Sequence, residues 1–459
     1  MGRSRYATRS GQAGRDWTQG SISGNLISLG WPMMVGGTLN MLGPTIDMIW
    51  VGKLGPAAIA AVGMSGMVVM LANSMLMGVF QGLRAMVARF IGAGETAEAN
   101  RVAQQAVAVA IVYSVVMALI GILLAEHILR LLGVGPDVIK EGAPYLRINF
   151  IGMVTMSFRM LSESAMQASG DSRAPMWVAI LFRLFHIALA PFLIFGWWVF
   201  PSMGVTGAAL TNVLSQGLGA AIGLWFLFSG RTRLRLTLRG FRFRPDLVWR
   251  LAKLALPASV TAMERTLGGL VLMWFISPFG TLAVASHSIN QRVEMFLQVP
   301  AMGMGQAAGV LAGQNLGARQ PGRAERTGWT GVGLLSALMA VCSAALLIWA
   351  EPIVRIFTAD PELIPLAATF VRIGAAGYVL MGCNSVLQQC ITGAGDTLIP
   401  MLVMLINMWA VQVPLAMVLP KVGGLGVLGV RWAMVLGTAT GVAAYVTYFR
   451  MGRWKKKLV

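Results

Sequence analysis

The chain has 459 residues, of which 56% are hydrophobic and only 12% are charged. Ordinary soluble domains carry roughly 25% charged residues, so this composition excludes a soluble enzyme. The formal net charge of +19 lies in tails and short connections, where it sets membrane topology, and a nucleic-acid partner is not expected. Cys342, Cys383 and Cys390 lack metal-site spacing, so neither disulfides nor structural zinc is predicted.

The apolar runs predict an all-α polytopic membrane protein with about twelve transmembrane helices. A bilayer crossing takes roughly 20 apolar residues, and only a helix satisfies its own backbone hydrogen bonds over such a run. The predicted crossings are 26–50, 56–82, 102–125, 142–168, 175–200, 204–229, 248–277, 280–306, 327–350, 363–391, 397–420 and 424–449.

Basic segments divide these crossings into two sets of six. Residues 1–21 have several arginines but no apolar core, so they are interpreted as a cytoplasmic tail and not as a signal peptide. The predicted parts after this tail are an N-lobe (22–229), a basic cytoplasmic linker (230–247), a C-lobe (248–449) and a basic cytoplasmic tail (450–459).

Lysine and arginine predict the orientation of the chain. They concentrate in both tails, in alternate loops and in the linker, which places both termini in the cytoplasm. The basic stretch at 230–250 is interpreted as a topology determinant near anionic lipid headgroups, without chemistry of its own.

An internal repeat relates the two halves at a constant offset of 225 residues, as between Pro32 and Pro257. Six helices are an even number, so both copies enter and leave on the same side and are parallel repeats, an arrangement typical of transporters. Further pairs at this offset are Gly55 and Gly280, Gln81 and Gln306, Ala99 and Ala324, Arg101 and Arg326, and Arg147 and Arg372.

The repeated element GD(S/T)xxPM occurs at 170–176 and 395–401. We interpret it as a helix start, because an acidic residue there suits the helix dipole and proline suits the first turn.

In order and spacing, these features resemble the multidrug and toxic compound extrusion (MATE) family, with mixed features of its NorM and DinF branches. The resemblance rests on the first-helix proline, Asp47 in TIDMIWVGKLG, GQNLGAR at 313–319, the YLRI and FVRI helix starts and both GD(S/T) turns. It implies a V-shaped molecule of two six-helix lobes. It also implies export of organic, often cationic compounds, driven by inward movement of protons or sodium.

Lone ionisable groups in the crossings are candidates for coupling. An acid at the bilayer centre costs about 2.5–3.5 kcal/mol, so it usually faces a cavity and serves function. Asp47 has no basic neighbour within a helical turn and is the first candidate for ion coupling and substrate binding; the alternative is a structural salt bridge. In resembling proteins the matching Asp binds protons or cations.

For the other charged residues in the crossings, the sequence allows either a functional or a structural role. Glu264 in the seventh crossing lies at about the depth of a Glu that helps bind the coupling cation in the NorM branch, so it is a candidate for ion coupling or for attracting a cationic substrate. His287, Arg292 and Glu294 in the eighth crossing either shape a substrate cavity or pair with other helices. Glu163 can reach Arg159 one turn earlier, which favours a structural ion pair.

The fifth crossing departs from the DinF pattern NxxxDPxxIFG. Ala190 stands where that pattern has Asp, and His186 stands where it has Asn. His186 either shares the proton with Asp47, since imidazole titrates near neutral pH, or hydrogen-bonds another helix. Arg183, one turn earlier, is a candidate substrate ligand.

The sodium site of the NorM branch is also incomplete, because no acid occurs in GYVLMGCNSVLQQC at 377–390. Sodium prefers several oxygen ligands, so protons are the expected coupling ion and no cofactor is expected. Asn73, Gln81 and Tyr378 are further candidate substrate contacts.

These interpretations favour a proton-coupled antiporter that exports amphipathic organic cations by alternating access across a bacterial inner membrane. We expect a monomer whose partners are small organic cations or drugs and membrane lipids. A sodium-coupled exporter and a flippase for lipids or their precursors are the alternatives. An enzyme is not expected, since no nucleophile, metal or ATP-binding motif occurs.

Overall fold

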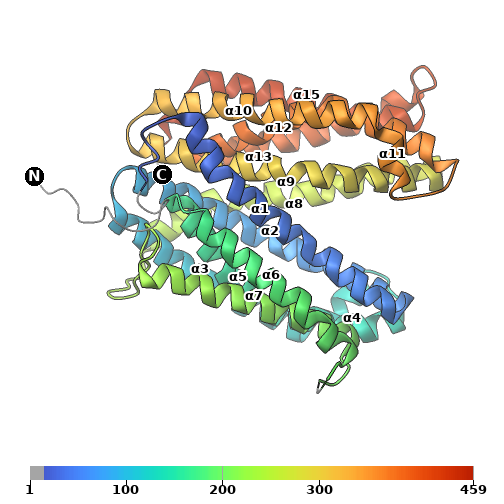
Figure 1. Ribbon diagram of the computed structural model, residues 1–459, viewed down its shortest axis with the longest axis horizontal. Coiled ribbons are helices and arrows are strands. Elements are labelled where there is room, and N and C mark those ends of the chain that lie inside the picture. The colour runs from blue at the N-terminus through green and yellow to red at the C-terminus, as the bar shows by residue number, and fades with distance from the viewer. Residues whose placement is uncertain (1–14, 199, 458–459) are drawn as a thin grey trace, which may run out of the picture. The chain divides into compact units, whose positions relative to one another are not determined.

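The structure, a computed structural model, describes residues 15–198 and 200–457, so most of the expected N-terminal tail lies outside the described residues. The described residues are helical and contain no strand (Figure 1). The first half comprises α1 (Ile22–Val51), η1 (Gly52–Leu54), α2 (Pro56–Gly92), α3 (Thr96–Leu131), α4 (Pro136–Ile151), α5 (Met153–Ser169), α6 (Arg173–Phe195) and α7 (Gly204–Ser229).

The second half follows the linker with a similar series. It comprises α8 (Pro245–Ile276), η2 (Ser277–Phe279), α9 (Thr281–Gly317), α10 (Pro321–Ile348), α11 (Ala350–Arg355), α12 (Leu363–Gly393), α13 (Leu398–Ile406), η3 (Asn407–Gln412), α14 (Val413–Val418), η4 (Leu419–Lys421), α15 (Val427–Met451) and η5 (Arg453–Lys456).

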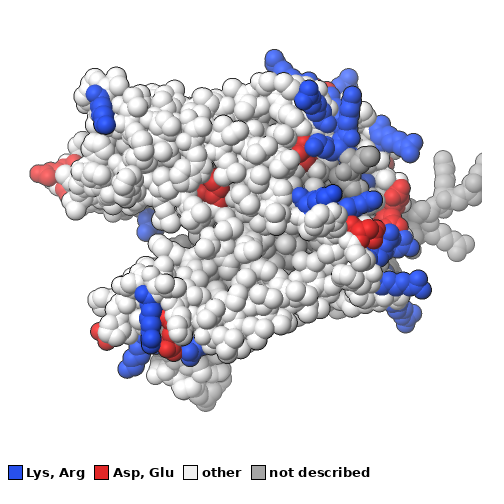
Figure 2. All heavy atoms as spheres, turned by 180° about the vertical axis from the view of Figure 1, so that it is seen from behind, with Lys and Arg blue, Asp and Glu red and all other residues white. Residues whose placement is uncertain are grey.

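Twelve crossings fit these helices, because α4 and α5 form one interrupted crossing and α13 to α14 form another. Within the described chain, nine helical segments are long and apolar enough by themselves to span a membrane. In Figure 2 the charged side chains of each unit gather at the ends of its helices, and the surface along their middle is almost uncharged.

The chain forms two compact units whose divisions fall inside helices. Of the described residues, one unit contains 35–255 together with 15–16, and the other contains 17–34 together with 256–457. The divisions therefore lie within α1 and within α8, close to Pro32 and Pro257. Proline removes one intrahelical hydrogen bond, so these are the points at which each helix can bend.

The repeat is visible in the helix boundaries and in one ion pair. The bounds of α2 and α9 differ by 225 residues at both ends. Arg147 pairs with Glu126 at 2.8 Å, and their counterparts Arg372 and Glu351 pair at 3.4 Å. The internal repeat read from the sequence is thus present in the scaffold.

The two GD(S/T) elements precede helices as the sequence predicts. Asp171 accepts a hydrogen bond from the backbone N–H of Ala174 at the start of α6. Asp396, at the start of α13, accepts one from the hydroxyl of Tyr448 in α15 and lies 3.5 Å from Lys457. Asp171 therefore stabilises its own helix start, whereas Asp396 ties the start of α13 to α15 and to the C-terminal segment.

Candidate functional site

The first candidate site is a carboxylate–imidazole pair in the unit of residues 35–255. Oδ1 of Asp47 on α1 lies 2.8 Å from Nε2 of His186 on α6, and both side chains are buried. The structure therefore brings together the two residues for which the sequence left a contact open.

Apolar packing surrounds this pair. One turn further along each helix lie Val51 and Ala190, which are fully buried in one hydrophobic cluster with residues of α2, α4 and α7. Such surroundings have a low dielectric and few competing hydrogen-bond partners. In such surroundings a charge on this pair needs a nearby fixed charge to balance it.

Arg183 supplies that fixed charge. It lies one turn before His186, is buried, and donates a hydrogen bond from Nη2 to the backbone oxygen of Asn40 at 3.4 Å. Its guanidinium packs directly against Gly43, where a Cβ atom would clash with Nη1 and Nη2. Asn40, Gly43 and Asp47 follow one stripe of α1, so only a glycine there leaves room for Arg183 beside Asp47.

The second candidate site is a cavity of about 540 Å³ in the other unit. All its lining residues belong to the unit that contains residues 256–457, and they come from α8, α9, α12, α13, η3 and α15. Its volume lies within the usual range for sites that bind drug-sized molecules, roughly 300–1,000 Å³.

An ion pair fixes one wall of this cavity. Nη2 of Arg431 on α15 donates to Oε1 of Glu294 on α9 at 3.0 Å, and Nδ2 of Asn290 donates to the same oxygen at 2.7 Å. Arg431 is fully buried and also lies over the ring of Phe370. Glu294 is thereby held as a paired charge at the cavity wall.

Other polar groups of the lining lack a partner among the described residues. They are Oε1 of Glu264, both ring nitrogens of His287, the hydroxyl of Tyr378 and Oδ1 of Asn384. Buried polar atoms without partners are costly in a folded protein, and they are a reason to expect a ligand or water at the site. Glu264 is the acidic member of this set.

A π-helical turn shapes the same cavity. η3 replaces α-helix over Asn407–Gln412, and Asn407, Met408 and Gln412 all line the cavity. Pro414 follows directly in α14. Short π-helical segments are rare and occur often at functional sites, because they redirect side chains within a helix.

The remaining predicted residues lie apart from these two sites or on their margins. Arg292 is exposed and does not line the cavity, whereas Gln291 and Glu294 do. Asn73 and Gln81 are half-buried on α2, and Oδ1 of Asn73 has no partner in the described chain. Glu163 pairs with Arg159 at 2.8 Å, as the spacing predicts.

Sequence reasoning missed Arg431 and the π-helical turn. Arg431 is a lone basic residue within an apolar run, and the cost of burying charge, which drew attention to Asp47, applies equally to it. The π-helical turn had no comparable signal, because NMWAVQ reads as ordinary membrane helix.

Replacing Glu294 with Ala is expected to destabilise the protein by about 3 kcal/mol, because Arg431 would remain buried without its counter-ion. Glu351→Ala is the matched control: it breaks the half-exposed pair with Arg372 and should cost at most about 1 kcal/mol. Unfolding midpoints in detergent measure both changes. Equal effects of the two substitutions would contradict this account of the Arg431 pair.

Comparison with known proteins agrees with this architecture. A model of the MatE family matches residues 32–192 and 257–418, once in each half. The probable multidrug resistance protein NorM of Thermotoga maritima is 28% identical over 452 residues, covering 95% of this chain and 94% of its own. The probable multidrug resistance protein YoeA of Bacillus subtilis is 26% identical over 432 residues, covering 93% of this chain and 93% of its own. A solved MOP superfamily transporter from Pyrococcus furiosus shares the fold, with a TM-score of 0.89 and 22% identity over 96% of this chain and 98% of its own. The chain belongs to the MatE family of multidrug efflux transporters.

Proposed function

We propose that this transporter exports organic cations in exchange for protons, and that Asp47 and His186 carry the exchanged proton. The buried 2.8 Å contact between these two side chains is the observation that carries the proposal. An imidazole and a carboxylate are both proton-exchanging groups, and their contact lets them share one proton as a single unit.

Charge balance supports a two-state cycle. Arg183 lies close enough to Asp47 to interact with it electrostatically. With His186 neutral, the charges of Asp47 and Arg183 cancel, and uptake of a proton leaves the cluster with one net positive charge. A net charge in low dielectric is unfavourable. The protonated cluster therefore favours a more polar environment than the unprotonated cluster does. Such a difference is the requirement for coupling proton binding to a conformational change.

The cavity of the second unit is the proposed substrate site. Glu264 offers an unpartnered carboxylate oxygen to a cation, and Glu294 is held nearby on the wall by Arg431. Six methionines also line the cavity, and their flexible, polarisable side chains suit ligands of different shapes. They are Met295, Met302, Met381, Met404, Met408 and Met434.

The placement of positive charge supports a bacterial inner membrane with both termini in the cytoplasm. The basic linker and the basic C-terminal segment then lie on the same side of the membrane. We propose that a monomer is the working unit.

Sodium is the alternative coupling ion, and one observation favours it. Oxygens of Glu264, Tyr378 and Asn384 line the cavity without partners in the described chain, and oxygen ligands are what sodium requires. Only one of these three residues is an acid. Protons remain the proposal, because Asp47 already has a titratable partner in His186.

Replacing Asp47 with Asn is expected to abolish substrate-dependent proton flux, because the amide cannot exchange a proton. The measurement uses proteoliposomes with an imposed pH gradient, to which ethidium is added while an enclosed pH-sensitive dye is followed. Asp137→Asn, an exposed acid in the same unit, is the matched control and should behave as the wild type. Proton flux at the wild-type rate in Asp47→Asn, or ethidium transport that requires sodium and ignores the pH gradient, would refute proton coupling through Asp47.

Replacing Glu264 with Gln is expected to weaken ethidium binding roughly 10- to 150-fold, because a hydrogen bond to a charged group contributes about 1.5–3 kcal/mol. Fluorescence titration of the purified protein measures this affinity. Glu362→Gln, an exposed acid in the same unit, should leave it unchanged. Unaltered binding in Glu264→Gln would remove Glu264 from the substrate site without affecting the proposal for Asp47.

A further inference from the structure

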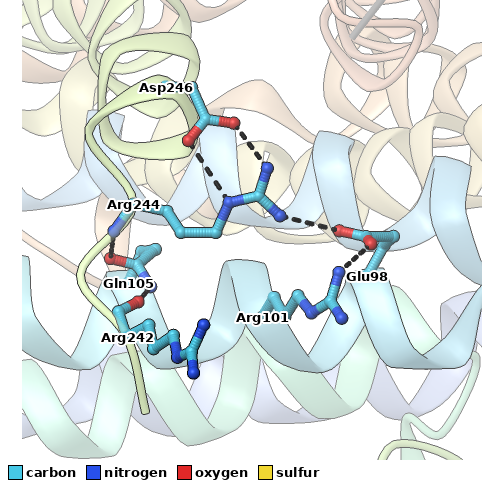
Figure 3. Close-up of polar contacts among 6 residues, drawn as sticks. All are labelled: Glu98, Arg101, Gln105, Arg242, Arg244 and Asp246. Atoms are coloured by element: carbon cyan, nitrogen blue, oxygen red, sulfur yellow. Dashed lines mark hydrogen bonds and ion pairs between the residues drawn. The ribbon is translucent and has the colours of Figure 1, made fainter.

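The linker between the two halves is held in place by side chains of α3. Asn100 exchanges two hydrogen bonds with Thr237, from Nδ2 to Oγ1 at 3.0 Å and from the backbone N–H of Thr237 to Oδ1 at 3.1 Å. Gln105 donates to the backbone oxygen of Arg242 at 2.9 Å and accepts from the backbone N–H of Arg244 at 3.1 Å (Figure 3). Two amide side chains thus fix the linker backbone at both ends of the segment 238–241.

Arg244 adds a further contact between the linker and α3. Its guanidinium donates to both carboxylate oxygens of Asp246, at 3.3 and 2.9 Å, and lies 3.9 Å from Glu98 of α3 (Figure 3). On the other side of the segment, Leu234 and Leu236 are buried, and the backbone N–H of Leu236 donates to the oxygen of Leu227. The linker is therefore a docked element of its unit.

Docking leaves one short segment facing outward, which we call the tip (238–243, LRGFRF). All six of its residues are exposed, including the large apolar side chains of Leu238, Phe241 and Phe243. Phe243 is 62% exposed. Exposed aromatic side chains on a backbone that is fixed in place are unfavourable in water, so they indicate a surface that is covered in the native setting.

The tip combines these apolar groups with positive charge. The guanidinium groups of Arg239 and Arg242 have no ion-pair or hydrogen-bond partner among the described residues, and in Figure 3 only the backbone of Arg242 takes part in the contacts drawn. Apolar side chains interleaved with cations complement a surface that has anionic groups above hydrocarbon.

Tryptophans place the tip at the membrane boundary. Trp225 lies one turn before the end of α7 and Trp249 one turn after the start of α8, and both are about half or more exposed. Arg231 lies over Trp225 at 4.3 Å, and Lys253 lies over Trp249 at 5.4 Å. Tryptophan is enriched at headgroup depth, so the chain crosses that level on either side of the tip.

We infer that the tip is a binding site for the headgroup of an anionic phospholipid, with Arg239 and Arg242 contacting the phosphate and Phe241 and Phe243 entering the acyl boundary. This role differs from that of a topology determinant, because it needs the docked backbone and the aromatic residues as well as the charge. It is also independent of the coupling ion and of the exported compound.

The test counts lipids retained by the purified full-length protein in detergent, by native mass spectrometry during titration with phosphatidylglycerol or phosphatidylcholine. The wild type should retain phosphatidylglycerol in preference to phosphatidylcholine. Arg239→Gln with Arg242→Gln should weaken that retention about 25-fold, since each arginine near an anionic surface contributes a factor of about five. Phe241→Ser with Phe243→Ser should weaken retention of both lipids.

Arg326→Gln with Arg453→Gln is the matched control, because it removes two exposed arginines of the other unit. It should retain phosphatidylglycerol as the wild type does, and added inorganic phosphate should not displace the lipid. An equal loss in this control, or full retention in the Arg239 and Arg242 variant, would overturn the inference. So would displacement by phosphate alone. Unchanged unfolding midpoints verify that every variant is folded.

Discussion

The structure depends on one constraint: an ionisable side chain inside the bilayer must be compensated by the chain itself. Lipid offers neither hydrogen bonds nor counter-ions, so each buried charge is either paired or poised to bind something. Asp47 contacts His186 and interacts electrostatically with Arg183, and Glu294 is paired with Arg431 and Asn290. Glu264 is the second case, because one of its oxygens is buried without a partner in the described chain.

The helices and several charged residues near their ends are repeated in the two halves, but the charged residues inside the membrane are not. At the offset of 225, Glu126, Arg147 and Asp171 recur as Glu351, Arg372 and Asp396, all of which lie near helix ends. The membrane-embedded groups do not recur: Leu272 matches Asp47, Val411 matches His186, Leu39 matches Glu264, Val69 matches Glu294 and Thr206 matches Arg431. The two copies of the fold therefore contain different buried side chains, which agrees with the proposed proton site in one unit and the proposed substrate site in the other.

The sequence predicted the crossings, the repeat and the candidates Asp47, His186 and Glu264, because hydropathy and the cost of buried charge act locally. It did not predict which helices meet. The approach of Arg183 to Asp47 depends on Gly43 in another helix, and the pair of Glu294 and Arg431 joins residues 137 positions apart. The division of the chain inside α1 and α8 was also not foreseen, since the basic linker is the more evident boundary. Such features arise from packing between distant segments, for which one sequence has no direct signal.

The most direct test of the central claim is proton release on substrate binding, measured with a pH indicator in weakly buffered detergent solution. If Asp47 and His186 form the exchanged proton site, binding of ethidium to the wild type at neutral pH should release about one proton per molecule, by the reciprocity of linked binding. Asp47→Asn should bind ethidium and release none. Release of the same number of protons by Asp47→Asn would show that the proton is held elsewhere and would contradict the account.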